Sequence, residues 1–224
     1  MEVSLAGPSR ETTVRVTEIF YSIQGESTYA GQPCVFVRLT GCPLRCTWCD
    51  TEYSFYGGTL LSIDALLAQV AQYGCRLVEV TGGEPLAQPE AVSLIARLCD
   101  EGYTVLLETS GAIDIEPVDR RVRVILDVKC PGSGMTDRMH WPNLDRLTAK
   151  DEAKFVLADR ADYDWARELV ARYRLADRCI VLFSPVFGSL DLRELAEWIL
   201  ADRLSVRFQL QLHKYIWSPD MRGV

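Results

Sequence analysis

Histidine is scarce in this sequence, and neither a long apolar run nor an excess of positive charge is present. The two histidines, His140 and His213, are far apart, so they contribute little to a closed zinc site, which takes four ligands. No apolar run has the length needed to span a bilayer. The formal net charge of −7 argues against a large nucleic-acid interface, which needs a basic face. We therefore expect neither a membrane nor a nucleic-acid partner.

The N-terminal residues lack the features of a secretory signal. Residues 1–13 contain no charged start followed by an apolar stretch, and they are polar, so we expect a flexible tail in a cytoplasmic protein. With 48% hydrophobic and 25% charged residues, the chain suits one α/β domain of ordinary size. We expect this domain to span residues 14–217, followed by a C-terminal tail, residues 218–224, that could close an active site.

Segments with strand character alternate with segments of helical character from residue 34 onward. We predict strands over 34–40, 76–81, 103–109, 122–129, 153–158, 179–184 and 206–212, and helices over 62–73, 88–101, 161–174 and 191–201. Such alternation predicts βαβ units and a mainly parallel sheet. Because a complete eight-unit barrel takes ~250 residues, we expect a partial, open (β/α) barrel.

Polar motifs stand where these predicted strands end. GCPLRC follows the first strand, TGGEP closes the second, ETSG closes the third, and Lys129 ends the fourth. In barrels and open parallel sheets, the carboxyl ends of the strands carry the active site. The sequence therefore predicts one site, built by several loops at this edge of the sheet.

Three of the eight cysteines lie close together, in the segment GCPLRCTWCD. Cys42, Cys46 and Cys49 have the spacing C-x3-C-x2-C, and thiolates suit iron–sulfur clusters and zinc. A cubane cluster normally takes four cysteines, so three leave one iron open for a chelating molecule such as S-adenosylmethionine (SAM). A zinc-stabilised binding module is the alternative, although its structural site would need a fourth ligand.

The cysteine loop and the TGGEP motif together resemble the radical SAM superfamily, in which a GGE-type motif holds the amino group of SAM. Gly82 and Gly83 permit close backbone approach, and Glu84 can accept hydrogen bonds from an ammonium group. The resemblance implies a 4Fe-4S cluster on the three cysteines, SAM as a cofactor, the partial barrel of that superfamily and an external electron donor, flavodoxin or ferredoxin.

Flanking segments look like the 7-carboxy-7-deazaguanine synthase family. These segments are EIFYSIQGES at 18–27, CDT at 49–51, SGM at 133–135 and QLHKYIW at 211–217. The resemblance covers residues 18–217. It implies a homodimer that converts 6-carboxy-5,6,7,8-tetrahydropterin to 7-carboxy-7-deazaguanine with loss of ammonia, by 5′-deoxyadenosyl radical hydrogen abstraction and ring contraction, in queuosine and 7-deazapurine biosynthesis for tRNA modification.

The same resemblance implies binding residues, and no catalytic residue beyond the cluster and the SAM site. Those implied for the pterin substrate are Ile23, Gln24, Gly25, Glu26, Arg38, Thr81, His213 and Val224. Those implied for SAM are Trp48, Cys49, Asp50, Gly82, Gly83, Glu84, Ser110, Asp127, Val128 and Lys129. Thr51 would be a ligand of Mg²⁺, and Arg38 would pair with the substrate carboxylate through its planar fork. Arg222 is an alternative partner for that carboxylate.

A glycyl-radical-enzyme activating enzyme is the main alternative function. That class shares the C-x3-C-x2-C loop and a TGGEP-like motif, but it acts on a protein partner and needs a docking groove. The EIFYSIQGE segment and Arg38 favour a small carboxylated substrate instead.

Overall fold

The computed structural model describes residues 12–224, and its strands form one sheet. The strands are β1 (Thr13–Ile23), β2 (Pro33–Leu39), β3 (Thr59–Ser62), β4 (Leu77–Gly82), β5 (Thr104–Thr109), β6 (Arg123–Val128), β7 (Glu152–Leu157), β8 (Ile180–Pro185) and β9 (Arg207–Phe208). The α-helices are α1 (Ile63–Ala71), α2 (Glu90–Asp100), α3 (Asn143–Arg146), α4 (Arg160–Tyr173), α5 (Leu192–Ala201) and α6 (His213–Ile216). Within this part of the chain, no helix is both long and apolar enough to cross a bilayer.

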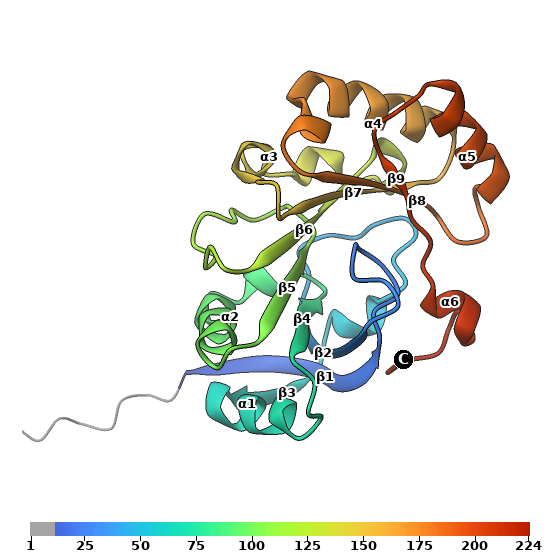
Figure 1. Cartoon of the computed structure of the whole chain (residues 1–224). Helices are drawn as coiled ribbons and strands as arrows, with labels where there is room; N and C mark the ends of the chain where they lie inside the picture. Colours follow the sequence, from blue (N-terminus) through green and yellow to red (C-terminus); the bar gives the residue numbers. More distant parts are fainter. Residues whose placement is uncertain (1–11) are drawn as a thin grey trace, which may run out of the picture.

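The sheet is open and mostly parallel, as the sequence predicts. Its order is β3-β1-β2-β4-β5-β6-β7-β8-β9. Each pair of adjacent strands from β2–β4 to β8–β9 is parallel, whereas β1 is antiparallel to both β2 and β3. Figure 1 shows the curved sheet with α1 and α2 along one half and α4 and α5 along the other.

The structure differs from the predicted elements at both ends of the sheet. Strands β1 and β3 were not predicted, and Thr13, which we assigned to the flexible tail, is the first residue of β1 and pairs with Ser62. Residues 1–11 of that predicted tail lie outside the described residues. The predicted strand over 206–212 is wrong in its length, because β9 ends at Phe208. Beyond it, the Leu212 N–H donates to the Gly25 carbonyl at 2.8 Å, which draws the chain away from the sheet.

The four predicted helices form at the expected places, and three of them, α1, α4 and α5, begin at a capping side chain. The Ser62 hydroxyl accepts from the Ala65 N–H at 3.2 Å at the start of α1. Asp159 accepts from the Asp162 N–H at 2.9 Å at the start of α4. Such caps satisfy backbone donors that have no partner within the helix. Each of these helices then buries an apolar face against the sheet, as Leu66 and Val70 do in α1.

Alternation along the strands separates a helix-covered core from a cavity face. In β2, Val35 and Val37 lie in the main core, whereas Phe36 lies in a second apolar cluster on the opposite face, followed by Arg38. Side chains alternate in this way because a strand repeats every two residues. The other residues of the second apolar cluster are Cys34, Leu77, Leu106 and Ile125. Two positions further along β4, β5 and β6 stand Glu79, Glu108 and Asp127. On the cavity face of the sheet, a row of carboxylates therefore follows the second apolar cluster toward the carboxyl ends of the strands.

Candidate active site

A cavity of about 710 Å³ lies at the carboxyl ends of the parallel strands. Cys42, Cys46 and Cys49 line it, together with residues from the loops after β4, β5 and β6. The C-terminal segment, defined here as residues 211–224, runs past the open side of the sheet and returns toward β1 (Figure 1). The predicted loops therefore meet at this cavity, and the C-terminal segment runs along it.

The loop after β2 directs three thiols toward this cavity. Backbone bonds hold it in place, from the Gly41 N–H to the Ser54 carbonyl at 2.8 Å and from the Thr47 N–H to the Ser133 carbonyl at 3.1 Å. Burial raises the pKa of all three cysteine thiols, so binding of a metal centre would be coupled to the release of their protons.

Three soft donors on one cavity wall fit a 4Fe-4S cluster. Within residues 12–224, no group of three or more His, Cys, Asp or Glu side chains is arranged to hold a single metal ion. In a cubane cluster each cysteine binds a different iron, and a set of three leaves the fourth iron open to a chelating ligand. The donor set that the chain presents, Cys42, Cys46 and Cys49, therefore suits such a cluster.

The turn after β4 packs directly on the cysteine loop. Gly82 has a φ of +154°, and a Cβ on it would lie 2.8 Å from the Leu39 nitrogen. A Cβ on Gly83 would lie 2.6 Å from the Cys42 Cβ. The Glu84 N–H donates to the Gly41 carbonyl at 2.8 Å. The two glycines are thus needed for the close approach of the two loops, and both line the cavity.

Glu84 is placed differently from its predicted role in SAM binding. Its side chain is fully buried and is not among the cavity-lining residues. The carboxylate accepts from the Leu86 N–H at 2.9 Å, from the Thr109 hydroxyl at 2.9 Å and from the Ser110 N–H at 2.7 Å. It therefore ties the β4 turn to the end of β5, where Ser110 does line the cavity.

Asp50 and Thr51 face the cavity as neighbouring oxygen donors. The Thr51 hydroxyl donates to Asp50 Oδ1 at 2.8 Å, and Lys214 Nζ donates to Asp50 Oδ2 at 2.7 Å. Burial opposes ionisation of this carboxyl, but Lys214 and Thr51 hold its pKa well below the usual range. Asp50 is thus a carboxylate that joins the cysteine loop to the C-terminal segment, and Trp48 lines the cavity beside it.

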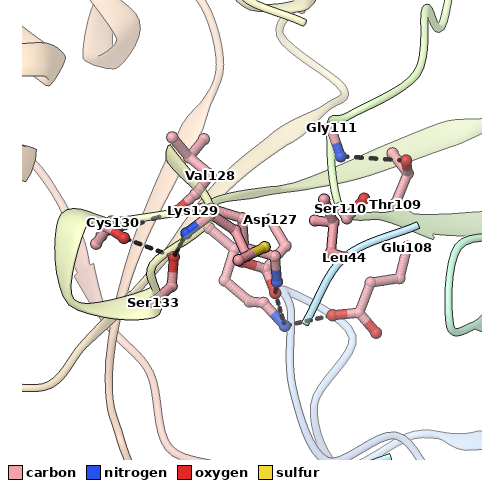
Figure 2. A network of polar contacts seen from close by, with 12 residues as sticks. Leu44, Glu108, Thr109, Ser110, Gly111, Asp127, Val128, Lys129, Cys130 and Ser133 are labelled. Atoms are coloured by element: carbon pink, nitrogen blue, oxygen red, sulfur yellow. Dashed lines mark hydrogen bonds and ion pairs between the residues drawn. The ribbon is translucent and has the colours of Figure 1, made fainter. Parts of the chain in front are cut away.

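Asp127 and Lys129 lie together at the end of β6, as Figure 2 shows. Lys129 Nζ contacts Asp127 Oδ2 at 2.9 Å, and both side chains line the cavity. Burial disfavours each charge, yet the pair raises the pKa of Lys129 and lowers that of Asp127. Val128 between them is buried in the helix-covered core, so only its backbone could meet SAM.

Five of the residues predicted for the substrate line the cavity: Glu26, Arg38, Thr81, His213 and Val224. Arg38 Nε donates to Glu18 Oε1 at 2.8 Å, and the same oxygen accepts from the Tyr53 hydroxyl at 2.7 Å. Burial lowers the pKa of His213, which favours its neutral form. This wall therefore combines a carboxylate, a guanidinium, a hydroxyl and an imidazole.

The other three predicted substrate residues, Ile23, Gln24 and Gly25, are not among the residues that line the cavity. Ile23 lines a separate pocket of about 210 Å³, and Val224 lines both spaces. Gln24 is only 3% exposed; its amide donates to Glu79 and its Oε1 accepts from the Glu26 N–H at 2.9 Å. Gly25 packs against His213, and a Cβ on it would lie 3.0 Å from the imidazole Cγ. Gln24 and Gly25 therefore help to position Glu26 and His213, which do line the cavity.

The sequence reasoning missed several residues of the cavity wall. Glu79 and Lys154 are charged side chains inside short apolar strands. Tyr53 lies in a 3-10 turn, Phe187 in the loop after β8 and Lys214 in α6. Glu79 and Lys154 could have been found from the sequence as single charged residues within apolar strands, LVEVTG and EAKFVL. A charge in such a run is either on a solvated face or buried with partners.

The open sheet and the three-cysteine loop define a radical SAM enzyme, and the model of the Radical SAM superfamily matches residues 36–199. The 7-carboxy-7-deazaguanine synthase of Chlorobaculum tepidum is 48% identical over 219 residues, which cover 96% of this chain and 100% of that protein. The enzyme of the same name from Koribacter versatilis is 47% identical and covers 94% and 100%. The chain belongs to the 7-carboxy-7-deazaguanine synthase family.

A solved structure agrees with this fold. QueE from Escherichia coli superposes with a TM-score of 0.76 at 24% sequence identity, covering 92% of this chain and 100% of that one. This likeness concerns the fold alone. The predictions of the superfamily, of the family and of a partial, open barrel are confirmed, and the relatives do not favour the activating-enzyme alternative. Superfamily membership also confirms the 4Fe-4S cluster and SAM as cofactors.

Proposed function

We propose that this enzyme converts 6-carboxy-5,6,7,8-tetrahydropterin to 7-carboxy-7-deazaguanine with loss of ammonia, within queuosine and 7-deazapurine biosynthesis. The observation that carries this proposal is the shared cavity: Cys42, Cys46 and Cys49 face the same space as Glu26, Arg38 and His213. When bound, the reduced cluster and SAM supply a 5′-deoxyadenosyl radical that abstracts a substrate hydrogen. The chain's own residues bind and orient the two molecules and limit the access of water.

The cofactor side of the cavity offers groups that match SAM. We assign to it Trp48, Asp50, Gly82, Gly83, Ser110, Asp127 and Lys129. Asp127 supports this assignment because its Oδ1 atom is buried and has no hydrogen-bond partner within the described residues. A buried acceptor of this kind costs free energy unless a ligand donates to it. Glu84 acts there by fixing the turn that carries Gly83.

The opposite wall offers groups that match a carboxylated pterin. Glu26 can accept from the N–H donors of the pterin edge, and Arg38 retains N–H groups beyond its single bond to Glu18. Arg222 also lines the cavity, with its guanidinium carbon 4.0 Å from the centre of the Tyr53 ring. Val224 lies at the same end. We propose that residues 218–224 close the site over the bound substrate.

Thr51 and Asp50 form a pair of hard oxygen donors beside the cysteine loop. Magnesium prefers oxygen ligands and keeps several waters when it binds through one or two protein groups. We propose Thr51 as the protein ligand of a Mg²⁺ ion that also contacts the substrate. We further propose a cytoplasmic homodimer that receives electrons from flavodoxin or ferredoxin.

An anaerobic assay tests this function directly. The purified enzyme is reconstituted with iron and sulfide, reduced, and given SAM, Mg²⁺ and 6-carboxytetrahydropterin, and mass spectrometry follows the products. We expect 7-carboxy-7-deazaguanine, with SAM not consumed in proportion. A Cys46→Ser variant treated in the same way is the matched control and should give none. If SAM is cleaved to 5′-deoxyadenosine and no deazaguanine forms, the substrate assignment is wrong.

A further inference from the structure

Lys154 lies in the middle of β7 with its side chain turned to the cavity. The residue is only 4% exposed, although it lines the cavity wall. Its neighbours Ala153 and Phe155 pack in the helix-covered core, so the alternation of the strand directs Lys154 to the opposite face. An ammonium group with so little contact with water needs charged partners.

Three carboxylates from three different elements supply those partners. Lys154 Nζ contacts Glu26 Oε2 at 2.9 Å and Asp127 Oδ2 at 3.7 Å, and it also pairs with Glu108. Glu26 follows β1, Glu108 lies on β5 and Asp127 lies on β6. Figure 2 shows Glu108 and Asp127 as they extend from neighbouring strands. Lys154 therefore joins segments that are far apart in the sequence.

The three partners depend on Lys154 to different degrees. Asp127 has a second cation, Lys129, at 2.9 Å. Within residues 12–224, Glu26 and Glu108 form ion pairs with Lys154 and with no other cation. Their other contacts are neutral, from Gln211 to Glu26 at 3.1 Å and from Thr81 to Glu108 at 3.3 Å. Removing the ammonium group would therefore release Glu26 and Glu108 while Asp127 stays held.

We propose that Lys154 is a positioning residue: it holds Glu26, on the wall assigned to the pterin, and the cavity-lining Glu108 in register with Asp127, on the wall assigned to SAM. This inference rests on the proposed function. Glu26 and Asp127 lie on the two sides that we assign to substrate and cofactor, and Lys154 forms ion pairs with both. A small displacement between a bound radical precursor and its target can cost ~100-fold in rate, because hydrogen abstraction needs close alignment.

The test measures how tightly SAM cleavage is coupled to product formation. In Lys154→Met we expect 5′-deoxyadenosine released per deazaguanine to rise at least about tenfold. Cleavage of SAM without substrate should stay within about twofold of the wild type, because Lys129 still holds Asp127. Equilibrium dialysis should show weaker binding of pterin-6-carboxylate, a non-reactive probe, by about tenfold. Lys150→Met is the matched control, because Lys150 pairs with Asp151 outside the cavity.

A second variant separates positioning from a loss of folding. Lys154→Arg keeps the charge but changes the reach and shape of the donor, so it should restore the folded enzyme and its iron content while coupling stays impaired. Full recovery of coupling in Lys154→Arg would mean that charge alone matters, and it would overturn the inference. So would unchanged coupling in a folded Lys154→Met, or an equal loss of SAM cleavage without substrate. If the wild type binds pterin-6-carboxylate but forms no deazaguanine, only the proposed function fails, and the dialysis comparison still decides the role of Lys154.

Discussion

Gly83 and Cys42 approach each other so closely that a Cβ on the glycine would lie 2.6 Å from the cysteine Cβ. Real Cβ atoms essentially never approach that closely, and the Gly41 carbonyl blocks the same position. The backbone around Gly83 is also fixed by the bond from the Glu84 N–H to the Gly41 carbonyl. The turn after β4 therefore sets the position of the first cluster ligand.

Gly83→Ala should lower both iron loading and activity. The added methyl group must push the turn or the cysteine loop aside, at a cost of about 1–3 kcal/mol. Iron and sulfide per chain after reconstitution are the measurement. Gly74→Ala is the control, because nothing lies within 4 Å of the new methyl group there, even though Gly74, unlike Gly83, has a positive φ of +62°. Normal iron content in Gly83→Ala would show that the loops do not depend on this contact.

Replacement of Cys42, Cys46 or Cys49 by alanine should abolish cluster binding and product formation. Each of these thiols lines the cavity, whereas Cys99 and Cys179 pack in or against the core. Cys99→Ala and Cys179→Ala should therefore keep the visible absorbance of the reconstituted cluster. Loss of that absorbance in either, with the fold intact, would contradict the ligand assignment.

Glu79→Gln should stabilise the fold at neutral pH relative to the wild type. Burial, together with Glu108 and Glu26, raises the pKa of Glu79 well above its usual range. The unfolded chain therefore loses this proton first, above about pH 4.3, and the wild type loses up to ~1.4 kcal/mol of stability per pH unit until the folded-state pKa is reached. Glutamine carries no such titration.

Urea unfolding at pH 5 and pH 8 checks this prediction. The stability difference between Glu79→Gln and the wild type should be small at pH 5 and should favour the variant at pH 8. Glu197→Gln, on the exposed face of α5, is the control and should show no comparable change. A difference that is the same at both pH values would mean that Glu79 ionises normally.

Thr51→Ala should weaken the magnesium dependence of the reaction and leave the cluster absorbance unchanged. The hydroxyl is the group we assign to the ion, so about tenfold or more Mg²⁺ should be needed for half-maximal activity. Thr51→Ser keeps the hydroxyl and should behave like the wild type. An unchanged response in Thr51→Ala would remove this residue from the metal site.

Local patterns were sufficient to predict the parallel core of the sheet. The strand predicted over 103–109 is observed as Thr104–Thr109, and the helix predicted over 161–174 as Arg160–Tyr173. Both have an apolar pattern of the right period and clear ends. β1 was not predicted as a strand because its polar and apolar residues do not alternate clearly. β3 was not predicted because a strand of four residues is too short to show a pattern.

Local sequence patterns also predicted some of the residues of the site. The cysteine loop and the glycines are local motifs, and they lie together as predicted. Lys154 was not found, because a single lysine in a short strand does not reveal which face it occupies or which distant carboxylates it meets. Those partners, Glu26 and Glu108, are 128 and 46 residues away in the sequence. Only the register of the whole sheet brings them together.

The alternation along the central strands also limits how this protein can be altered. Glu79 and Glu108 occupy cavity positions only because each strand keeps its register with its neighbours. Deleting or inserting one residue within β4 or β5 would exchange the two faces of that strand and drive a carboxylate among the aliphatic side chains beneath the helices. These strands should accept substitutions far better than changes in length, so a library built on this scaffold should vary loop length and leave strand length alone.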